Sequence, residues 1–196
     1  VFFDIQPDNA SKTVLFTRSL EPVYDAATLI RSALLVLEKA AEARFIIAGS
    51  GTQGEQLRSL AHDLGVADRV TFLGHVPHGD IPGLTSRSRV FVSTALADGT
   101  SIALLETMAA GLVPVATDIG ANRALISHGR DGYLFRPGDE QDLAAHILKA
   151  LSGEISARVL LQKKASLKEK IPWSIIADRF IRSYNQLLER PHRHLE

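Results

Sequence analysis

The stretch VFVSTALADGTSIALLETMAAGLVPVA, residues 90–116, decides the fold class. It begins with a short apolar run, Val90–Ser93, and ends with a second one, Val113–Ala116. Between them a polar turn with a glycine leads into Ser101–Ala110, which is rich in good helix formers. Two strands joined through a helix pair in parallel, because the crossover returns the chain to the same end of the sheet. The stretch therefore predicts one strand-helix-strand unit of a parallel sheet.

The same alternation continues along the rest of the chain. It predicts a doubly wound α/β fold of about six parallel strands with helices on both faces. The expected strands are Thr13–Thr17, Arg44–Ala48, Val70–Leu73, Val90–Ser93, Val113–Ala116 and Gly132–Phe135. The expected helices are Tyr24–Ala40, Gly54–Leu64, Ser101–Ala110, Glu140–Leu151 and Ile175–Glu189. The stripe of the first helix that faces the sheet is expected at Ala27, Ile30, Leu34 and Leu37.

The composition excludes several classes of protein. The 196 residues suffice for one domain, and 45% apolar with 22% charged residues is globular composition. No apolar run approaches the roughly 18 to 20 residues of a membrane span, and no basic amphipathic helix supports membrane association of a parent enzyme. Lysine plus arginine equal aspartate plus glutamate at 22 each, which argues against a nucleic-acid partner. The absence of cysteine removes thiolate and disulfide chemistry and fits a cytoplasmic protein.

The two ends of the chain are expected to lie outside the folded unit. We expect residues 1–11 to be a linker remnant, residues 12–190 to form one domain that includes a C-terminal helix, and residues 191–196 to be a partly vector-derived tail. His192 and His194 in that tail are too isolated to predict a metal site. The basic stretch Lys163–Lys170 is interpreted as the solvated face of a helix.

The strongest functional signal lies between Asp98 and Glu106, where a predicted strand gives way to a helix. Ligands of parallel sheets bind at the carboxyl ends of the strands, where the loops lead to the helices. Gly99 lets the backbone approach a ligand, and the amides of the following helical turn form an anion site. Glu106 is the only charge in a helix with nearly all faces apolar, so we expect it to be buried and to need donors such as sugar hydroxyls. The alternatives are that Glu106 caps a neighbouring turn and that Asp98 only forms a turn before glycine.

Further candidates follow the other predicted strands. Arg18 is placed to neutralise a diphosphate, and its alternative is a surface arginine paired with Glu21. Gly49 and Gly51 follow the second strand, but their spacing does not complete a dinucleotide fingerprint. The pair His75-Val76 follows the third strand at the expected mouth of the cleft, where a base stacks or bonds to the backbone; an exposed loop is the alternative for the histidine. The sequence contains no Walker loop and no Ser-His-Asp order.

These residues resemble the C-terminal, donor-binding domain of retaining glycosyltransferases with the GT-B fold, in particular the family 4 group. The resemblance runs from Lys12 to Leu188. Members carry an acid and a glycine, then a second acid after seven intervening residues, matched here by Asp98, Gly99 and Glu106. An alanine-rich helix and a Pro-Val strand follow, matched by MAAG at 108–111 and PVAT at 114–117. The similarity extends to FIIAGSG at 45–51, VTFLGHV at 70–76, GRDGYLF at 129–135, and Trp173 with the helix that closes the domain.

The resemblance implies one half of a GT-B fold, a Rossmann-like domain that binds a nucleotide-diphosphate sugar of UDP or GDP type without a metal or other cofactor. It implies that Glu106 holds the donor ribose, Asp98 contacts the transferred sugar and Arg18 balances the diphosphate. It also implies that the main chain after Asp98 binds sugar or phosphate and that the loop after the third strand lines the base. The residues assigned to donor binding are Gly49, Gly51, His75, Val76, Gly99, Thr100, Ser101 and Ile102.

Several features depart from the family pattern. The first acid is usually Glu and is Asp98 here, and the usual aromatic residue after Gly99 is Thr100. The family's Lys-Gly pair falls on Tyr24-Asp25, which removes the lysine expected to partner Arg18.

The predicted enzyme is a hexosyltransferase whose N-terminal acceptor domain is missing from this chain. We expect the isolated donor domain to transfer little sugar. Two alternatives remain: a fragment of a GT-B nucleotide-sugar epimerase, and a non-catalytic domain that uses the fold for protein contacts. The acid spacing favours the transferase.

Overall fold

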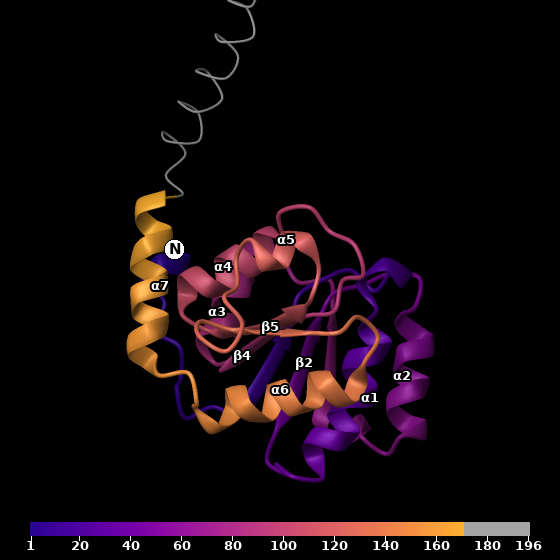
Figure 1. The fold of residues 1–196 in the computed structure, drawn as a ribbon. Coiled ribbons are helices and arrows are strands. Elements are labelled where there is room, and N and C mark those ends of the chain that lie inside the picture. The colour runs from indigo at the N-terminus through magenta and orange to yellow at the C-terminus, as the bar shows by residue number, and fades with distance from the viewer. Residues whose placement is uncertain (171–196) are drawn as a thin grey trace, which may run out of the picture.

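A six-stranded sheet forms the centre of the fold. In the computed structural model, which describes residues 1–170, all strands are parallel and their order is β3-β2-β1-β4-β5-β6 (Figure 1). The strands are β1 Thr13–Phe16, β2 Arg44–Ala48, β3 Val70–Gly74, β4 Val90–Ser93, β5 Val113–Thr117 and β6 Tyr133–Phe135. All six predicted strands are confirmed, with each boundary within one residue of its expected position.

Helices cover both faces of the sheet, as predicted (Figure 1). One face carries α1 Ala26–Leu37, α2 Gly54–Asp63 and α6 Glu140–Ser152. The other carries α3 Ile81–Ser86, α4 Ile102–Ala110 and α5 Gly120–Arg123, with α7 Ala157–Lys170 packed against α4. Short 3-10 turns complete the fold: η1 Phe2–Asp4, η2 Pro22–Tyr24, η3 Ala67–Arg69 and η4 His78–Asp80.

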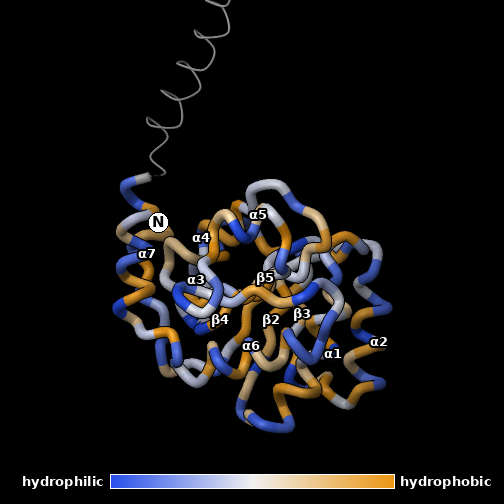
Figure 2. The backbone as a smooth tube through the Cα atoms, viewed as in Figure 1, coloured by the Kyte–Doolittle hydropathy of each residue, from blue (hydrophilic) through white to orange (hydrophobic). Residues whose placement is uncertain are grey.

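The strands supply side chains to two cores because successive residues of a strand point to opposite faces. In β1, Val14 and Phe16 belong to the core beneath α1 and α6, whereas Leu15 belongs to the core beneath α4. All three are essentially inaccessible to solvent. Figure 2 shows the resulting apolar strands in the interior of the molecule. A strand buried on both faces is apolar at every position, which is why these runs are so readable in the sequence.

The order of the strands positions the functional site. β1 lies in the middle of the sheet, with β2 on one side and β4 on the other. The chain therefore builds outward in one direction after β1 and in the opposite direction after β4. The loops that leave these two strands diverge, and in open α/β sheets this switch point is where ligands bind.

The first helix begins later and ends earlier than predicted. Tyr24 belongs to η2, and α1 starts at Ala26 because Asp25 caps it. The Asp25 carboxylate accepts hydrogen bonds from the Thr28 amide at 3.4 Å and the Thr28 hydroxyl at 2.6 Å. The predicted sheet-facing stripe is also out of phase. Of its four members only Ile30 is fully buried, and the others are partly buried beside Leu29, Ala33 and Val36.

The sequence patterns did not predict α3, α5 or the full length of α7. The interpretation of the basic stretch as a solvated face is wrong for two of its lysines. Lys163 Nζ donates to the Leu125 carbonyl at 2.6 Å and lies 3.0 Å from Asp131, and Lys164 Nζ donates to the Ile5 carbonyl at 2.8 Å. The predicted helix Ile175–Glu189, Trp173 and the two tail histidines lie outside the described residues.

Candidate functional site at the switch point

A cleft of about 320 Å³ opens at the carboxyl ends of β1, β2 and β3 and against α4. Each of these elements contributes side chains or main chain from the loop that follows it or from its first turns. The cleft is lined by Thr17, Arg18, Ser19, Ala48, Gly49, Ser50, His75, Val76, His78, Ile81, Ala103 and Glu106. The cleft thus brings together residues that are far apart in the sequence: Thr17 and Glu106 are separated by 89 positions.

Arg18 is the cation of the cleft, and it is fixed on several sides. Its Nη1 donates a hydrogen bond to Ser101 Oγ at 3.2 Å, and its Nη2 lies 2.9 Å from Asp98 Oδ2. Its guanidinium carbon lies 4.3 Å from the centroid of the Tyr24 ring. The expected alternative, a pair with Glu21, is wrong, because Glu21 accepts hydrogen bonds from the Thr52 amide and hydroxyl. Those two bonds lower the pKa of Glu21.

Asp98 retains hydrogen-bonding capacity next to this arginine. Its side chain is 16% exposed, and its Oδ2 is buried. The contact with Arg18 Nη2 meets the distance of an ion pair but lacks the angle of a hydrogen bond, so Oδ2 accepts no hydrogen bond from the described residues. A buried carboxylate oxygen without a donor is unusual in a folded protein. Its charge is balanced by Arg18 Nη2 at 2.9 Å, and Asp98 itself does not line the cleft.

The helix α4 begins at the rim of the cleft with Ser101 as its cap. The Ser101 hydroxyl accepts a hydrogen bond from the Leu104 amide at 3.3 Å while it also accepts from Arg18. The expectation that this helix is buried nearly all round is wrong at its first turn, where the Ile102 side chain is 69% exposed. Beyond this turn every residue of α4 is buried or partly buried, because the helix packs against the core through Leu104 and Met108 and against α7 and η1.

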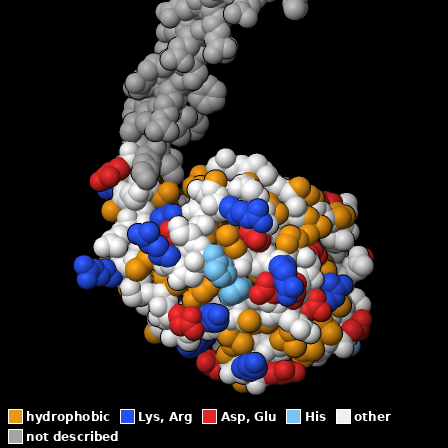
Figure 3. All heavy atoms as spheres, in the orientation of Figure 1, with side chains coloured by type: hydrophobic (Ala, Val, Ile, Leu, Met, Phe, Trp, Pro, Cys, Tyr) orange, Lys and Arg blue, Asp and Glu red, His pale blue; other side chains and the backbone are white. Residues whose placement is uncertain are grey.

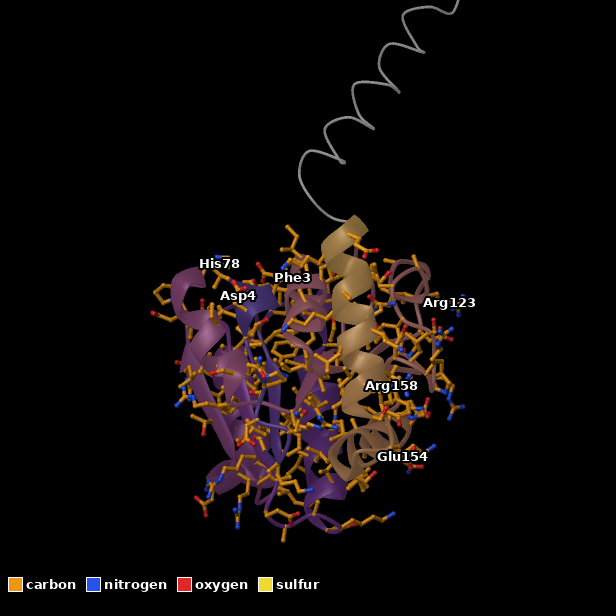
Figure 4. All side chains as sticks on the ribbon, turned by 90° about the vertical axis from the view of Figure 1, so that its left-hand side faces the viewer. Phe3, Asp4, His78, Arg123, Glu154 and Arg158 are labelled. Atoms are coloured by element: carbon orange, nitrogen blue, oxygen red, sulfur yellow. The ribbon has the colours of Figure 1, made fainter. Side chains whose placement is uncertain are left out.

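Glu106 lies one turn further along α4 and lines the cleft. Its side chain is 20% exposed, so it is only partly buried, contrary to expectation. Its Oε1 lies 2.7 Å from Nε2 of His78, which follows β3 in η4. The ring of His78 in turn lies 5.8 Å from that of Phe2. Figure 4 shows His78 beside Phe3 and Asp4, at the end of the molecule opposite Glu154 and Arg158.

Two of the predicted glycines allow close contact between loops. A Cβ on Gly49 would lie 2.0 Å from the Arg18 carbonyl oxygen, and one on Gly51 would lie 2.5 Å from the Leu20 carbonyl. The Leu20 amide also donates to the Ser50 carbonyl at 2.9 Å. Gly99 differs, since a Cβ there would meet nothing within 4 Å. Gly49 therefore shapes the wall of the cleft, and Gly51 allows the loop after β2 to pack against Leu20, whereas the space around Gly99 is unoccupied.

The structure brings some of the predicted site residues together and leaves others apart. Five of them line the cleft: Arg18, Gly49, His75, Val76 and Glu106. Asp98 and Ser101 do not line the cleft, but each contacts Arg18, which does. The remaining predicted residues, Gly51, Gly99, Thr100 and Ile102, are exposed and do not line it. Their roles in ligand binding stay predictions.

Sequence reasoning missed His78, Ile81 and Ala103. His78 was detectable, because it lies three residues beyond the candidate His75 in a loop that follows a predicted strand. Its partner was not, since Glu106 is 28 positions away. Within residues 1–170, no group of three or more histidine, cysteine, aspartate or glutamate side chains has the geometry to hold a metal ion. No helix in the same range is long and apolar enough to cross a membrane.

The fold and the cleft define an α/β domain of the kind that binds ligands at a switch point. The sequence model of the family described as "Glycosyl transferases group 1" matches residues 2–168. The chain belongs to this family of glycosyltransferases, and its sheet and helices match a GT-B domain of Rossmann-like architecture.

Three relatives illustrate the similarity. The chain is 30% identical over 175 residues to a phosphatidyl-myo-inositol mannosyltransferase of Mycobacterium leprae, covering 88% of this chain and 46% of that protein. It is 32% identical over 127 residues to a GDP-mannose-dependent alpha-(1-6)-phosphatidylinositol monomannoside mannosyltransferase of Mycobacterium tuberculosis, covering 61% of this chain and 33% of that protein. The crystal structure of Anabaena Alr3699/HepE in complex with UDP matches with a TM-score of 0.82 at 22% identity, covering 94% of this chain and 54% of that one. The chain thus spans about half, or less, of the length of these proteins.

Proposed function

We propose that this chain is the donor-binding domain of a retaining glycosyltransferase that transfers a hexose from a nucleotide-diphosphate sugar. The observation that carries the proposal is a single cleft with a fixed cation, Arg18, and a partly buried carboxylate, Glu106. A diphosphate needs a cation such as Arg18, and a ribose diol needs an acceptor such as the Glu106 carboxylate. The acceptor-binding half of the enzyme is proposed to lie in another domain, in keeping with the greater length of the relatives.

In this proposal each group has one task. Glu106 accepts hydrogen bonds from the ribose hydroxyls, and the loop His75-Val76 lines the base. Arg18 and the first-turn amides of α4 bind the diphosphate and stabilise the charge of the leaving group, without a metal ion or other cofactor. Asp98, which pairs with Arg18, contacts a hydroxyl of the transferred sugar.

The names of the relatives support a nucleotide sugar and leave its base open. One mannosyltransferase is described as GDP-mannose-dependent, and the Anabaena structure contains UDP. We therefore propose that the donor is of UDP or GDP type. The acid spacing favours a transferase over an epimerase of the same fold, and the ordered Arg18 favours a binding domain over a degenerate one.

A calorimetric titration with UDP, GDP and ADP tests the proposal. We expect heat of binding with UDP or GDP. The substitution Glu106→Ala should weaken that binding by about 1 to 3 kcal/mol, because the ribose loses its hydrogen bonds to a charged group. The matched control is Glu42→Ala, which removes an exposed carboxylate between α1 and β2.

Two outcomes would contradict the proposal. Absence of heat with all three nucleotides would support the non-catalytic alternative. Unchanged affinity in Glu106→Ala would remove the ribose-binding role of that residue. A separate assay of the chain alone with a radiolabelled donor and an acceptor should give little transfer, and sustained transfer would contradict the division into two halves.

A further inference from the structure

The aromatic ring of Tyr24 covers one side of the arginine that lines the cleft. The guanidinium carbon of Arg18 lies 4.3 Å from the centroid of this ring, within the distance of a cation–π contact. Tyr24 itself does not line the cleft. Its effect on a ligand must therefore pass through Arg18.

The main chain at Tyr24 is held by hydrogen bonds across the switch point. The Tyr24 carbonyl accepts a hydrogen bond from Thr94 Oγ1 at 2.6 Å, and the preceding carbonyl, that of Val23, accepts one from the Leu96 amide at 2.9 Å. Thr94 and Leu96 belong to the loop that leaves β4, whereas Tyr24 belongs to the loop that leaves β1. The main chain that carries the ring is thus bonded to the other of the two diverging loops that enclose the site.

The residue after Tyr24 is held in a strained conformation. Asp25 has φ 41° and ψ 48°, and it is the one non-glycine residue with positive φ among residues 1–170. Such strain persists only where the surrounding structure enforces it. Here the cap on α1 and the two hydrogen bonds to the β4 loop enforce it, and the sharp turn directs the chain so that Tyr24 lies against Arg18.

We propose that Tyr24 is a positioning residue that fixes the guanidinium of Arg18 for binding the diphosphate of the donor. This inference rests on the proposed function. An arginine side chain that is free to rotate loses conformational entropy when it binds an anion, and a pre-ordered one loses less. The ring also excludes water from one face of the guanidinium, which strengthens its remaining interactions. Ser101 and Asp98 then set its orientation within the plane.

The test compares Tyr24→Leu with Tyr24→Phe in binding of the nucleoside diphosphate that the unsubstituted chain prefers, UDP or GDP. We expect Tyr24→Leu to weaken diphosphate binding by about 3- to 30-fold, the range of a cation–π contact. Tyr24→Phe keeps the ring and should bind within about twofold of the unsubstituted chain. The corresponding nucleoside, uridine or guanosine, followed by NMR shifts, should bind equally to all three proteins, because it has no phosphate for Arg18.

The double substitution Arg18→Gln with Tyr24→Leu separates positioning from general damage. If Tyr24 acts through Arg18, the double variant should bind the diphosphate no more weakly than Arg18→Gln alone. Equal loss of nucleoside and diphosphate binding in Tyr24→Leu would overturn the inference, since it would indicate a collapsed cleft. Loss in Arg18→Gln without loss in Tyr24→Leu would overturn this inference alone. Absence of diphosphate binding by the unsubstituted chain would overturn the proposed function as well.

Discussion

Two clusters of aromatic and charged side chains in this domain differ in what surrounds them. The first is the arginine cluster, made by Arg18, Tyr24, Asp98 and Ser101 at the rim of the cleft. The second is the ring cluster, made by Tyr133 of β6, His146 of α6 and His128 in the loop before β6. The Tyr133 and His146 rings stack with centroids 5.1 Å apart, and the His128 ring meets His146 edge-on at 5.1 Å.

Two members of the ring cluster, His146 and Tyr133, have shifted pKa values of the kind that often marks functional sites. Burial lowers the pKa of His146, and burial together with the hydrogen bond to Glu154 raises the pKa of Tyr133 to about 12. Yet its rings pack against one another, and none of the clefts described in residues 1–170 is lined by them. Of these rings, His128 is exposed. Basic, acidic and apolar side chains are mixed over the face of the molecule that Figure 3 shows.

The comparison shows that shifted pKa values alone do not identify the functional site in this fold. Perturbed pKa values follow burial, and burial is as common in a core as in a binding site. The arginine cluster is distinguished by the open cleft that Arg18 lines. A buried polar atom without a hydrogen-bond partner does not distinguish the two, because each cluster has one, Asp98 Oδ2 and His146 Nδ1. We therefore expect the ring cluster to govern stability and the arginine cluster to govern binding.

The largest effect is expected in the ring cluster. Tyr133→Ala should lower the free energy of unfolding by about 3 to 5 kcal/mol, the cost of removing a buried aromatic side chain. Urea unfolding measures this change, and nucleotide affinity of the folded fraction should stay the same. Tyr133→Phe is the control, and it should lose only about 1 kcal/mol with the hydrogen bond to Glu154. Weakened nucleotide binding in a stable Tyr133→Ala protein would reverse the assignment of the two clusters.

A smaller effect on stability should distinguish Gly49, which packs tightly against the loop after β1, from Gly99, which has free space around it. Gly49→Ala places a methyl group 2.0 Å from the Arg18 carbonyl oxygen, and we expect it to destabilise the fold by about 1 to 3 kcal/mol. Gly99→Ala meets no atom within 4 Å and should change the free energy of unfolding by less than about 0.5 kcal/mol. Thermal unfolding of both variants tests this. Equal stability of the two proteins would show that the loops after β1 and β2 tolerate a wider spacing.

The smallest effect concerns the dependence of stability on pH. Burial favours neutral His146 in the folded state, so the unfolded state binds the proton more readily. The contribution of His146 to the free energy of unfolding should be fully present above the pKa of the unfolded state, about 6.5, and should fall as the pH is lowered through that value. His146→Phe keeps a stacked ring without titration, so its unfolding should depend less on pH between 7 and 5. The control His62→Gln changes an exposed ring and should leave the pH profile unaltered.

The pattern of strands was accessible from the sequence, whereas the phase of α1 and the helix α7 were not. Strands buried on both faces are apolar at nearly every position, so runs such as Val90–Ser93 can be assigned as strands from the sequence. Leu34 and Leu37 form an apparent stripe in α1, but the residues that are fully buried in the core include Leu29, Ala33 and Val36. Helical period alone does not choose between two adjacent apolar stripes.

The candidate site shows the same division. The spacing of Asp98, Gly99 and Glu106 indicated the site because it lies within one strand-helix connection. The partners of these residues are distant in sequence, and their choice depends on the packing of loops. Arg18 had Glu21 as its nearest carboxylate along the chain, yet Glu21 is held by Thr52 and Arg18 pairs with Asp98.

The sequence by itself therefore determined the parallel sheet, its six strands and the two acids that follow β4 and lie in α4. Only the tertiary structure decided that Tyr24 lies against Arg18, that His78 holds Glu106 and that Lys163 and Lys164 are bonded to main-chain carbonyls. The physical reason is the range of each interaction. Strand and helix formation depends on burial patterns within a few residues, whereas ion pairs and ring contacts depend on which loops the sheet order brings together.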